Sequence, residues 1–181
     1  GNLSWVEHGP DNIGGRTRSM IIHPTNPSIM FAGTVGGGIW RTSNAGLSWE
    51  PIDDFMGNLS VASLAFRPGN PNVIYAGTGE AIAADRIRGE GIWMSSDGGA
   101  SWAQLPSTST WQSAAHIAIS PTNTDLILVS TEAGVRRSTD GGNTWALVRG
   151  GSSNRVLFDP NNSNRCICHH ESGGHRIAYS S

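Results

Sequence analysis

Three stretches of this chain are nearly the same: TSNAGLSW at 42–49, SSDGGASW at 95–102 and STDGGNTW at 138–145. In the second octet, Asp97 can accept hydrogen bonds from the backbone N–H groups of its own turn, and Gly99 permits a positive φ. Trp102 can then fold back over the turn and bury its ring. The octet therefore predicts a rigid turn between two strands.

The octets carry structural rather than catalytic residues. Asn44 stands where the other two octets have Asp97 and Asp140, so the negative charge is dispensable. A side chain whose charge can be dropped is better suited to shaping a turn than to catalysis. We assign this structural role to Asn44, Gly46, Trp49, Asp97, Gly99, Trp102, Asp140, Gly142 and Trp145.

A proline recurs in phase with the octets, each time followed two residues later by an asparagine. The four prolines are Pro24, Pro68, Pro121 and Pro160. A period of roughly 40–50 residues is typical of β-propeller blades or of helical arrays. The β-branched runs and the frequent Gly and Pro exclude the helical alternative. The chain is therefore predicted to be an all-β propeller.

Each unit divides into four antiparallel strands. The first ends just before the proline, at Ser19–His23, Ala62–Arg67, His116–Ser120 and Arg155–Asp159. The second is a short apolar run such as Val73–Ala76, which suits a strand buried on both faces. The third is GIWRT at 38–42, GIWMS at 91–95 or GVRRS at 134–138, and the fourth begins at the octet Trp.

The two ends of the chain resemble two halves of a fourth octet. GNLSW at 1–5 aligns with AGLSW at 45–49, and AYSS at 178–181 aligns with WMSS at 93–96. We expect one propeller domain over residues 1–181, with blades near 9–52, 53–105, 106–148 and 149–181, the last completed by strand 4–8. That strand either closes a four-bladed ring or belongs to a larger propeller or an assembled ring. Both alternatives remain open.

Composition excludes several partners. Of the 181 residues, 37% are hydrophobic and 14% charged, and the net charge is −2. This balance gives no reason to expect a nucleic acid or an anionic membrane surface. No apolar run approaches the ~18 residues of a membrane helix, so no membrane insertion is expected.

The octets match the Asp-box, or BNR repeat, with the pattern Ser/Thr-x-Asp-x-Gly-x-Thr/Ser-Trp. Residues 9–52 also resemble the sortilin-type and xyloglucanase-type propeller repeats of secreted bacterial proteins. This resemblance implies a bacterial protein that is secreted or on the cell surface. It also implies that the box Asp is not catalytic. Because Asp-boxes occur in sialidases, xyloglucanases, receptors and assembly factors, the resemblance specifies the fold and not the chemistry.

The sequence lacks the catalytic residues that a sialidase or a xyloglucanase would need. The sialidase family uses a Tyr nucleophile, whereas Tyr75 and Tyr179 fall on predicted strands. Xyloglucanase-type enzymes have a motif of the form A-R-T-D-x-G-G-x-Y-R. This chain has AGTVGGGIWR at 32–41, which places Val35 at the catalytic Asp. Glycosidases need two facing carboxylates. Nothing in the sequence pairs the loop acids Asp11, Asp53, Asp54, Glu80, Asp85, Glu90, Glu132 and Glu171, so no catalytic residue is assigned.

The stretch CICHHESGGH at 166–175 contains potential zinc ligands. Cys166 and Cys168 occupy the buried positions of a second strand, however, and adjacent histidines face opposite sides of a strand. One Asp per octet is also too few for calcium. We therefore expect neither a metal nor a cofactor.

Two loops are the best candidates for a binding face. One is the insertion at 79–90, and the other is GPDNIGGRTR at 9–18. Trp111, between two blades, either stacks on a sugar or covers the blade. The candidate ligand-binding residues are Arg16, Arg18, Glu80, Arg86, Arg88 and Trp111.

These features favour a non-catalytic module that binds a protein or a polysaccharide. One alternative is a glycoside hydrolase of xyloglucanase or sialidase type. A second is a structural repeat fragment that assembles, as a homo-oligomer or otherwise, into a larger propeller.

Overall fold

The fold is a set of antiparallel sheets fanned around a common axis. The computed structural model describes residues 16–52, 60–80, 87–171 and 175–180. The only helix in these ranges is one 3-10 turn at Pro106–Thr108, and the rest of the regular structure is β-strand. The prediction of an all-β fold is therefore confirmed, and strand 4–8 lies outside the described residues.

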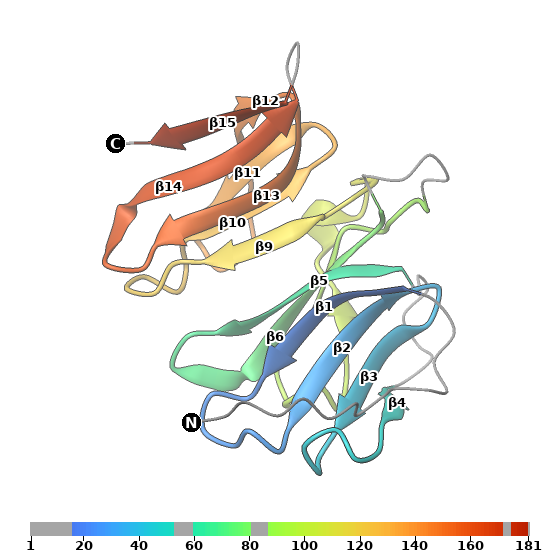
Figure 1. The fold of residues 1–181 in the computed structure, drawn as a ribbon. Helices are drawn as coiled ribbons and strands as arrows, with labels where there is room; N and C mark the ends of the chain where they lie inside the picture. The colour runs from blue at the N-terminus through green and yellow to red at the C-terminus, as the bar shows by residue number, and fades with distance from the viewer. Residues whose placement is uncertain (1–15, 53–59, 81–86, 172–174, 181) are drawn as a thin grey trace, which may run out of the picture.

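Four sheets follow one another along the chain (Figure 1), and each is a simple up-and-down meander. The first contains β1 (Arg16–Ile22), β2 (Met30–Val35), β3 (Gly38–Thr42) and β4 (Glu50–Ile52). The second contains β5 (Val61–Arg67), β6 (Asn70–Thr78), β7 (Ile92–Ser95) and β8 (Ala103–Gln104). The third contains β9 (His116–Ile119), β10 (Ile127–Thr131), β11 (Gly134–Ser138) and β12 (Ala146–Gly150). The fourth contains β13 (Ser152–Asp159), β14 (Asn162–Glu171) and β15 (His175–Ser180).

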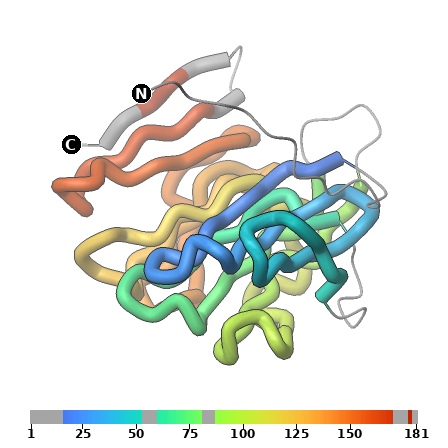
Figure 2. The backbone as a smooth tube through the Cα atoms, turned by 60° about the horizontal axis from the view of Figure 1, so that its bottom comes forward, coloured from blue at the N-terminus to red at the C-terminus, as the bar shows by residue number. Residues whose placement is uncertain are grey.

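These sheets are the predicted blades. The first three have four strands each, whereas the fourth has three within the described residues. The first strand of each blade is the innermost, so that β1, β5, β9 and β13 face the axis (Figures 1 and 2). Nearly all of β2 and β10 is buried, as their continuous apolar runs predicted, and so is the second half of β6. In β14, by contrast, Cys168 is buried but Cys166 is only half-buried and Ile167 is 44% exposed, so the prediction of two buried cysteines is wrong for Cys166.

Serine side chains tie the inner strands to one another. The Leu64 N–H of β5 donates to Ser19 Oγ of β1 at 2.9 Å, and the Ile117 N–H of β9 donates to Ser63 Oγ of β5 at 3.0 Å. In β1 and in β5, a β-bulge directly precedes the serine that accepts the hydrogen bond. The bulge turns the hydroxyl from its own sheet toward the next blade.

The octets form the rigid turns that the sequence predicts. Ser95 Oγ and the Ser101 N–H both donate to Asp97 Oδ1, at 2.8 and 2.9 Å, and Ser101 Oγ donates to Oδ2 at 2.6 Å. These bonds, led by that from the Ser101 hydroxyl, lower the pKa of Asp97 from 3.8 to about 2. Asp140 has the same bonds in the third blade. Asn44 accepts the Ser48 N–H at 2.9 Å through its amide oxygen.

The octet indoles join consecutive blades. Trp102 packs against the cluster of Phe31, Ile39 and Val61 between the first and second blades. Trp145 packs against the cluster that contains Tyr75 between the second and third blades. Each turn thus packs against the blade before it. Across the interface, or seam, between the second and third blades, the Tyr75 hydroxyl also donates to the Gly141 carbonyl at 3.1 Å.

Replacement of Gly99 by Ala tests this contact against a matched control. Both Gly99 and Gly36 have a positive φ, at 89° and 88°. A Cβ at Gly99 would lie 2.8 Å from Cε1 of the buried Phe31 ring, whereas a Cβ at Gly36 would meet nothing within 4 Å. We expect Gly36→Ala to lower the free energy of unfolding by about 1 kcal/mol and Gly99→Ala by about 2 kcal/mol more. Urea denaturation measures both, and equal losses would contradict the seam contact.

Candidate functional site

The inner strands enclose a polar pocket on the axis, which we call the axial pocket, with a volume of about 370 Å³. Its walls are formed by residues at equivalent positions of the four repeats. The residues five positions before each proline all line it: Ser19, Ser63, His116 and Arg155. The residues one position earlier also line it: Arg18, Ala62, Ala115 and Asn154. At these positions the first and last blades supply the arginines and the asparagine and the third supplies His116, whereas the second blade adds a carboxylate through Glu80.

Glu80 joins the two loops that the sequence singles out. It follows β6, is 4% exposed, and is held by its N–H, which donates to the Ile87 carbonyl at 2.8 Å. Its carboxylate accepts hydrogen bonds from two guanidinium groups: Arg16 Nη2 at 2.6 Å on one oxygen, and Arg18 Nη2 on the other. A buried carboxylate that engages two cations fixes the position of both, so Arg18 is held at the pocket wall.

His116 and Arg155 form the opposite side of the pocket. His116 Nδ1 is buried with no hydrogen-bond partner in the described part of the chain. Burial lowers the pKa of His116, the nearby charge of Arg155 lowers it further, and a hydrogen bond with the Val156 backbone opposes the shift. The ring is therefore neutral at pH 7. No described carboxylate forms an ion pair with Arg155.

Sequence reasoning missed His116, Asn154 and Arg155, although the signal was available. His116 and Arg155 occupy the fifth position before a recurring proline, where the first two blades have serine, and Asn154 occupies the sixth, where the second and third blades have alanine. A register comparison of the four repeats would have singled them out as departures facing the axis.

Trp111 is a buried packing residue. It is 5% exposed, meets Trp145 edge to face at 5.1 Å between ring centroids, and has the Arg136 guanidinium 4.8 Å from its ring centroid. This burial and these two ring contacts favour the alternative in which Trp111 covers the blade. Of the other candidates, Arg88 is exposed and Arg86 lies outside the described residues.

The axial pocket does not present paired carboxylates. Glu80 is the only acid among the described residues that line it. Val35 is 5% exposed at the end of β2. Glu132 is engaged by the Ser113 N–H at 2.9 Å. Asp11, Asp53, Asp54 and Asp85 lie outside the described residues, as does the Glu171 side chain. The side chains that line the pocket can donate hydrogen bonds and carry positive charge, which suits the pocket to binding a ligand.

The described residues contain neither a candidate metal site nor a candidate membrane-spanning helix. No group of three His, Cys, Asp or Glu side chains there could hold a metal ion. No helix there is long and apolar enough to cross a membrane.

Curated relatives of the chain are xyloglucanases. An oligoxyloglucan-reducing end-specific xyloglucanase of Emericella nidulans is 27% identical over 168 residues, which are 81% of this chain and 20% of that protein. A xyloglucanase of Paenibacillus is 25% identical over 152 residues, which are 75% of this chain and 14% of that protein. The chain thus spans about a fifth or less of the length of these relatives. No family model matches it.

Solved structures share the fold. An ancestral GH74 enzyme superposes with a TM-score of 0.70 at 23% identity, over 86% of this chain and 22% of that one. The structure of YCF48 bound to D1 peptide gives a TM-score of 0.62 at 16% identity, over 92% of this chain and 52% of that one. The chain is a β-propeller protein. Both neighbours are longer, and at these identities they establish architecture alone.

The neutral state of His116 predicts a dependence of stability on pH. Because its pKa is lower in the folded than in the unfolded chain, the unfolded chain takes up the proton first as the pH falls. Stability is therefore lost as the pH drops below about 6.5, by at most ~1.4 kcal/mol per pH unit for one proton. We expect His116→Gln to lose less stability than the wild type between pH 7.5 and 5.5, as measured by urea denaturation. Equal losses would show that His116 is not desolvated.

Proposed function

We propose that this chain is part of a xyloglucanase-type glycoside hydrolase and that it contributes polysaccharide binding rather than acid–base catalysis. The observation that carries the proposal is that relatives aligned over most of the chain are xyloglucanases. Their substrate class is a branched, hydroxyl-rich glucan. An extracellular location and a polysaccharide ligand belong to the same proposal.

The axial pocket supports the binding role. Arg18, Asn154, His116 and Arg155 all have N–H donors, and sugar hydroxyls and ring oxygens accept hydrogen bonds. The Glu80 ion pair orders Arg18 before a ligand arrives, which reduces the side-chain entropy lost on binding. Small residues on the second and third blades, Ala62 and Ala115, leave room beside these donors.

The lack of an acid pair supports the non-catalytic role. Glycoside hydrolysis uses two carboxyl groups about 5–10 Å apart on opposite sides of the scissile bond. In the axial pocket the described residues supply Glu80 alone, and both of its oxygens are bound to arginines. A carboxylate held by two cations stays ionised and is a poor proton donor.

The proposal is tested with xyloglucan oligosaccharides. Isothermal titration calorimetry should detect binding to the wild type, and a reducing-sugar assay should detect no hydrolysis. Arg155→Ala should weaken the affinity about tenfold, since one charged hydrogen bond contributes roughly 1.5 kcal/mol. Arg165→Ala is the matched control, because Arg165 is exposed on β14 and does not line the axial pocket.

Two outcomes would contradict the proposal. Release of reducing ends by the wild type would show that the chain is itself catalytic. Absence of binding, or equal affinities of the Arg155→Ala and Arg165→Ala variants, would remove the axial pocket from ligand recognition.

A further inference from the structure

The axial pocket carries positive charge in a chain whose net charge is −2. Glu80 is shared by Arg16 and Arg18, and these two cations and one anion leave a net charge of +1. Arg155 adds a second positive charge from the fourth blade, and no described acid forms an ion pair with it. The pocket is therefore a local positive site that attracts an anion.

Hydrogen-bond donors outnumber acceptors on the pocket wall. Both carboxylate oxygens of Glu80 are already bound to arginines. Ser19 Oγ and Ser63 Oγ each accept a backbone N–H from the next blade, which leaves each hydroxyl hydrogen to donate. His116 Nδ1 is buried behind the pocket surface. A sugar hydroxyl both donates and accepts, whereas a carboxylate only accepts, so this wall suits a carboxylate better.

The two arginines of the pocket have the geometry that a carboxylate requires. A guanidinium group is a planar fork of five N–H donors, which can bind both oxygens of one carboxylate. Arg18 gives one nitrogen to Glu80 and keeps other donors, and its side chain is 34% exposed. Arg155 is also exposed and lines the same pocket. Both groups are therefore accessible to a ligand.

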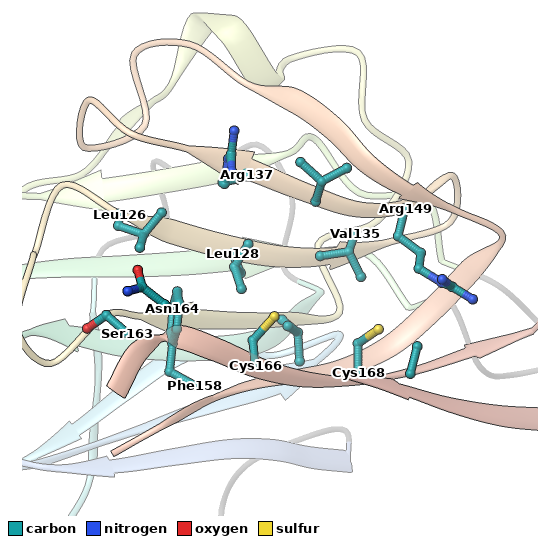
Figure 3. A pocket seen from close by; sticks show the side chains of 13 residues that line it. Leu126, Leu128, Val135, Arg137, Arg149, Phe158, Ser163, Asn164, Cys166 and Cys168 are labelled. Carbon is teal, nitrogen blue, oxygen red and sulfur yellow. The ribbon is translucent and has the colours of Figure 1, made fainter. Parts of the chain in front are cut away.

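A second cavity, of about 410 Å³ between the third and fourth blades, has the opposite chemistry. Figure 3 shows Leu128 facing Phe158 and Cys166 across it. Burial, and to a lesser degree the neighbouring Cys166, raise the pKa of the Cys168 thiol, although Arg149 opposes the shift. This cavity thus disfavours a negative charge even beside an arginine, which leaves the axial pocket as the better site for an anion.

We propose that the axial pocket holds a carboxylate between Arg18 and Arg155, and that its preferred ligand is a saccharide that carries a uronic acid. The inference rests on the saccharide-binding role proposed above and specifies the class of ligand. The volume of about 370 Å³ is within the range of small-ligand sites, so the pocket has room for a sugar ring with its carboxylate.

Two methyl glycosides are matched probes of this preference. Methyl β-glucuronoside and methyl β-glucoside differ only at C6, which is a carboxylate in the first and a hydroxymethyl group in the second. Isothermal titration calorimetry of the whole chain should give an affinity at least about fivefold higher for the glucuronoside, because hydrogen bonds to charged groups are stronger. The preference should shrink between about 50 and about 500 mM NaCl, since salt screens charges.

Replacement of Arg155 by Gln tests the position of the carboxylate. The Gln side chain keeps two N–H donors and removes the charge, so the ratio of the two affinities should fall toward one. Arg165→Gln is the matched control, because Arg165 is exposed on β14 and does not line the axial pocket. It should leave the ratio unchanged.

The outcomes separate this inference from the proposed function. Equal affinities of the wild type for the two glycosides would overturn the carboxylate site, even if neutral xyloglucan oligosaccharides bind. Failure of those oligosaccharides to bind, with the glucuronoside preference retained, would instead reject xyloglucan as the ligand and support the acidic class. Acetate that binds as tightly as the glucuronoside would overturn the saccharide ligand, and a preference that survives Arg155→Gln would overturn the placement.

Discussion

The structure depends on the contact between the indole of one octet turn and the blade that precedes it. A single four-stranded blade leaves apolar side chains uncovered on both faces, so its stability comes from its neighbours. Trp102 and Trp145 fill the first two seams, and hydrogen bonds within each turn hold the indole in place. The carboxylate or amide of the octet shapes the turn, and the indole ring packs against the preceding blade.

The same repetition builds the axial pocket. Because every inner strand has the same register, one sequence position in each repeat faces the axis. Serines at that position in the first two blades bond the blades together, whereas His116 and Arg155 in the last two offer polar groups to the pocket. Equivalent positions thus carry serine in the first two blades and larger polar groups in the last two, where His116 also has a hydrogen bond with the Val156 backbone of the next blade.

Much of the fold was predictable from the sequence, because the octets and prolines recur at fixed spacing. The strand ends and the turn hydrogen bonds of Asp97 follow from local chemistry. The Arg16–Arg18–Glu80 cluster was predictable only as two separate loops, since their meeting depends on how blades pack. Trp111 was ambiguous because a lone Trp in a connection has the same local signal whether buried or exposed. His116 and Arg155 required comparison of repeats rather than motifs.

The central claim is that octet indoles couple adjacent blades energetically. A double-mutant cycle between Tyr75 of the second blade and Trp145 of the third tests it most directly, with Tyr75→Leu, Trp145→Leu and the double variant unfolded in urea. The account predicts a coupling free energy of at least about 0.5 kcal/mol, as expected for residues in contact. Losses that add within about 0.3 kcal/mol would contradict it, because the two blades would then be stabilised independently.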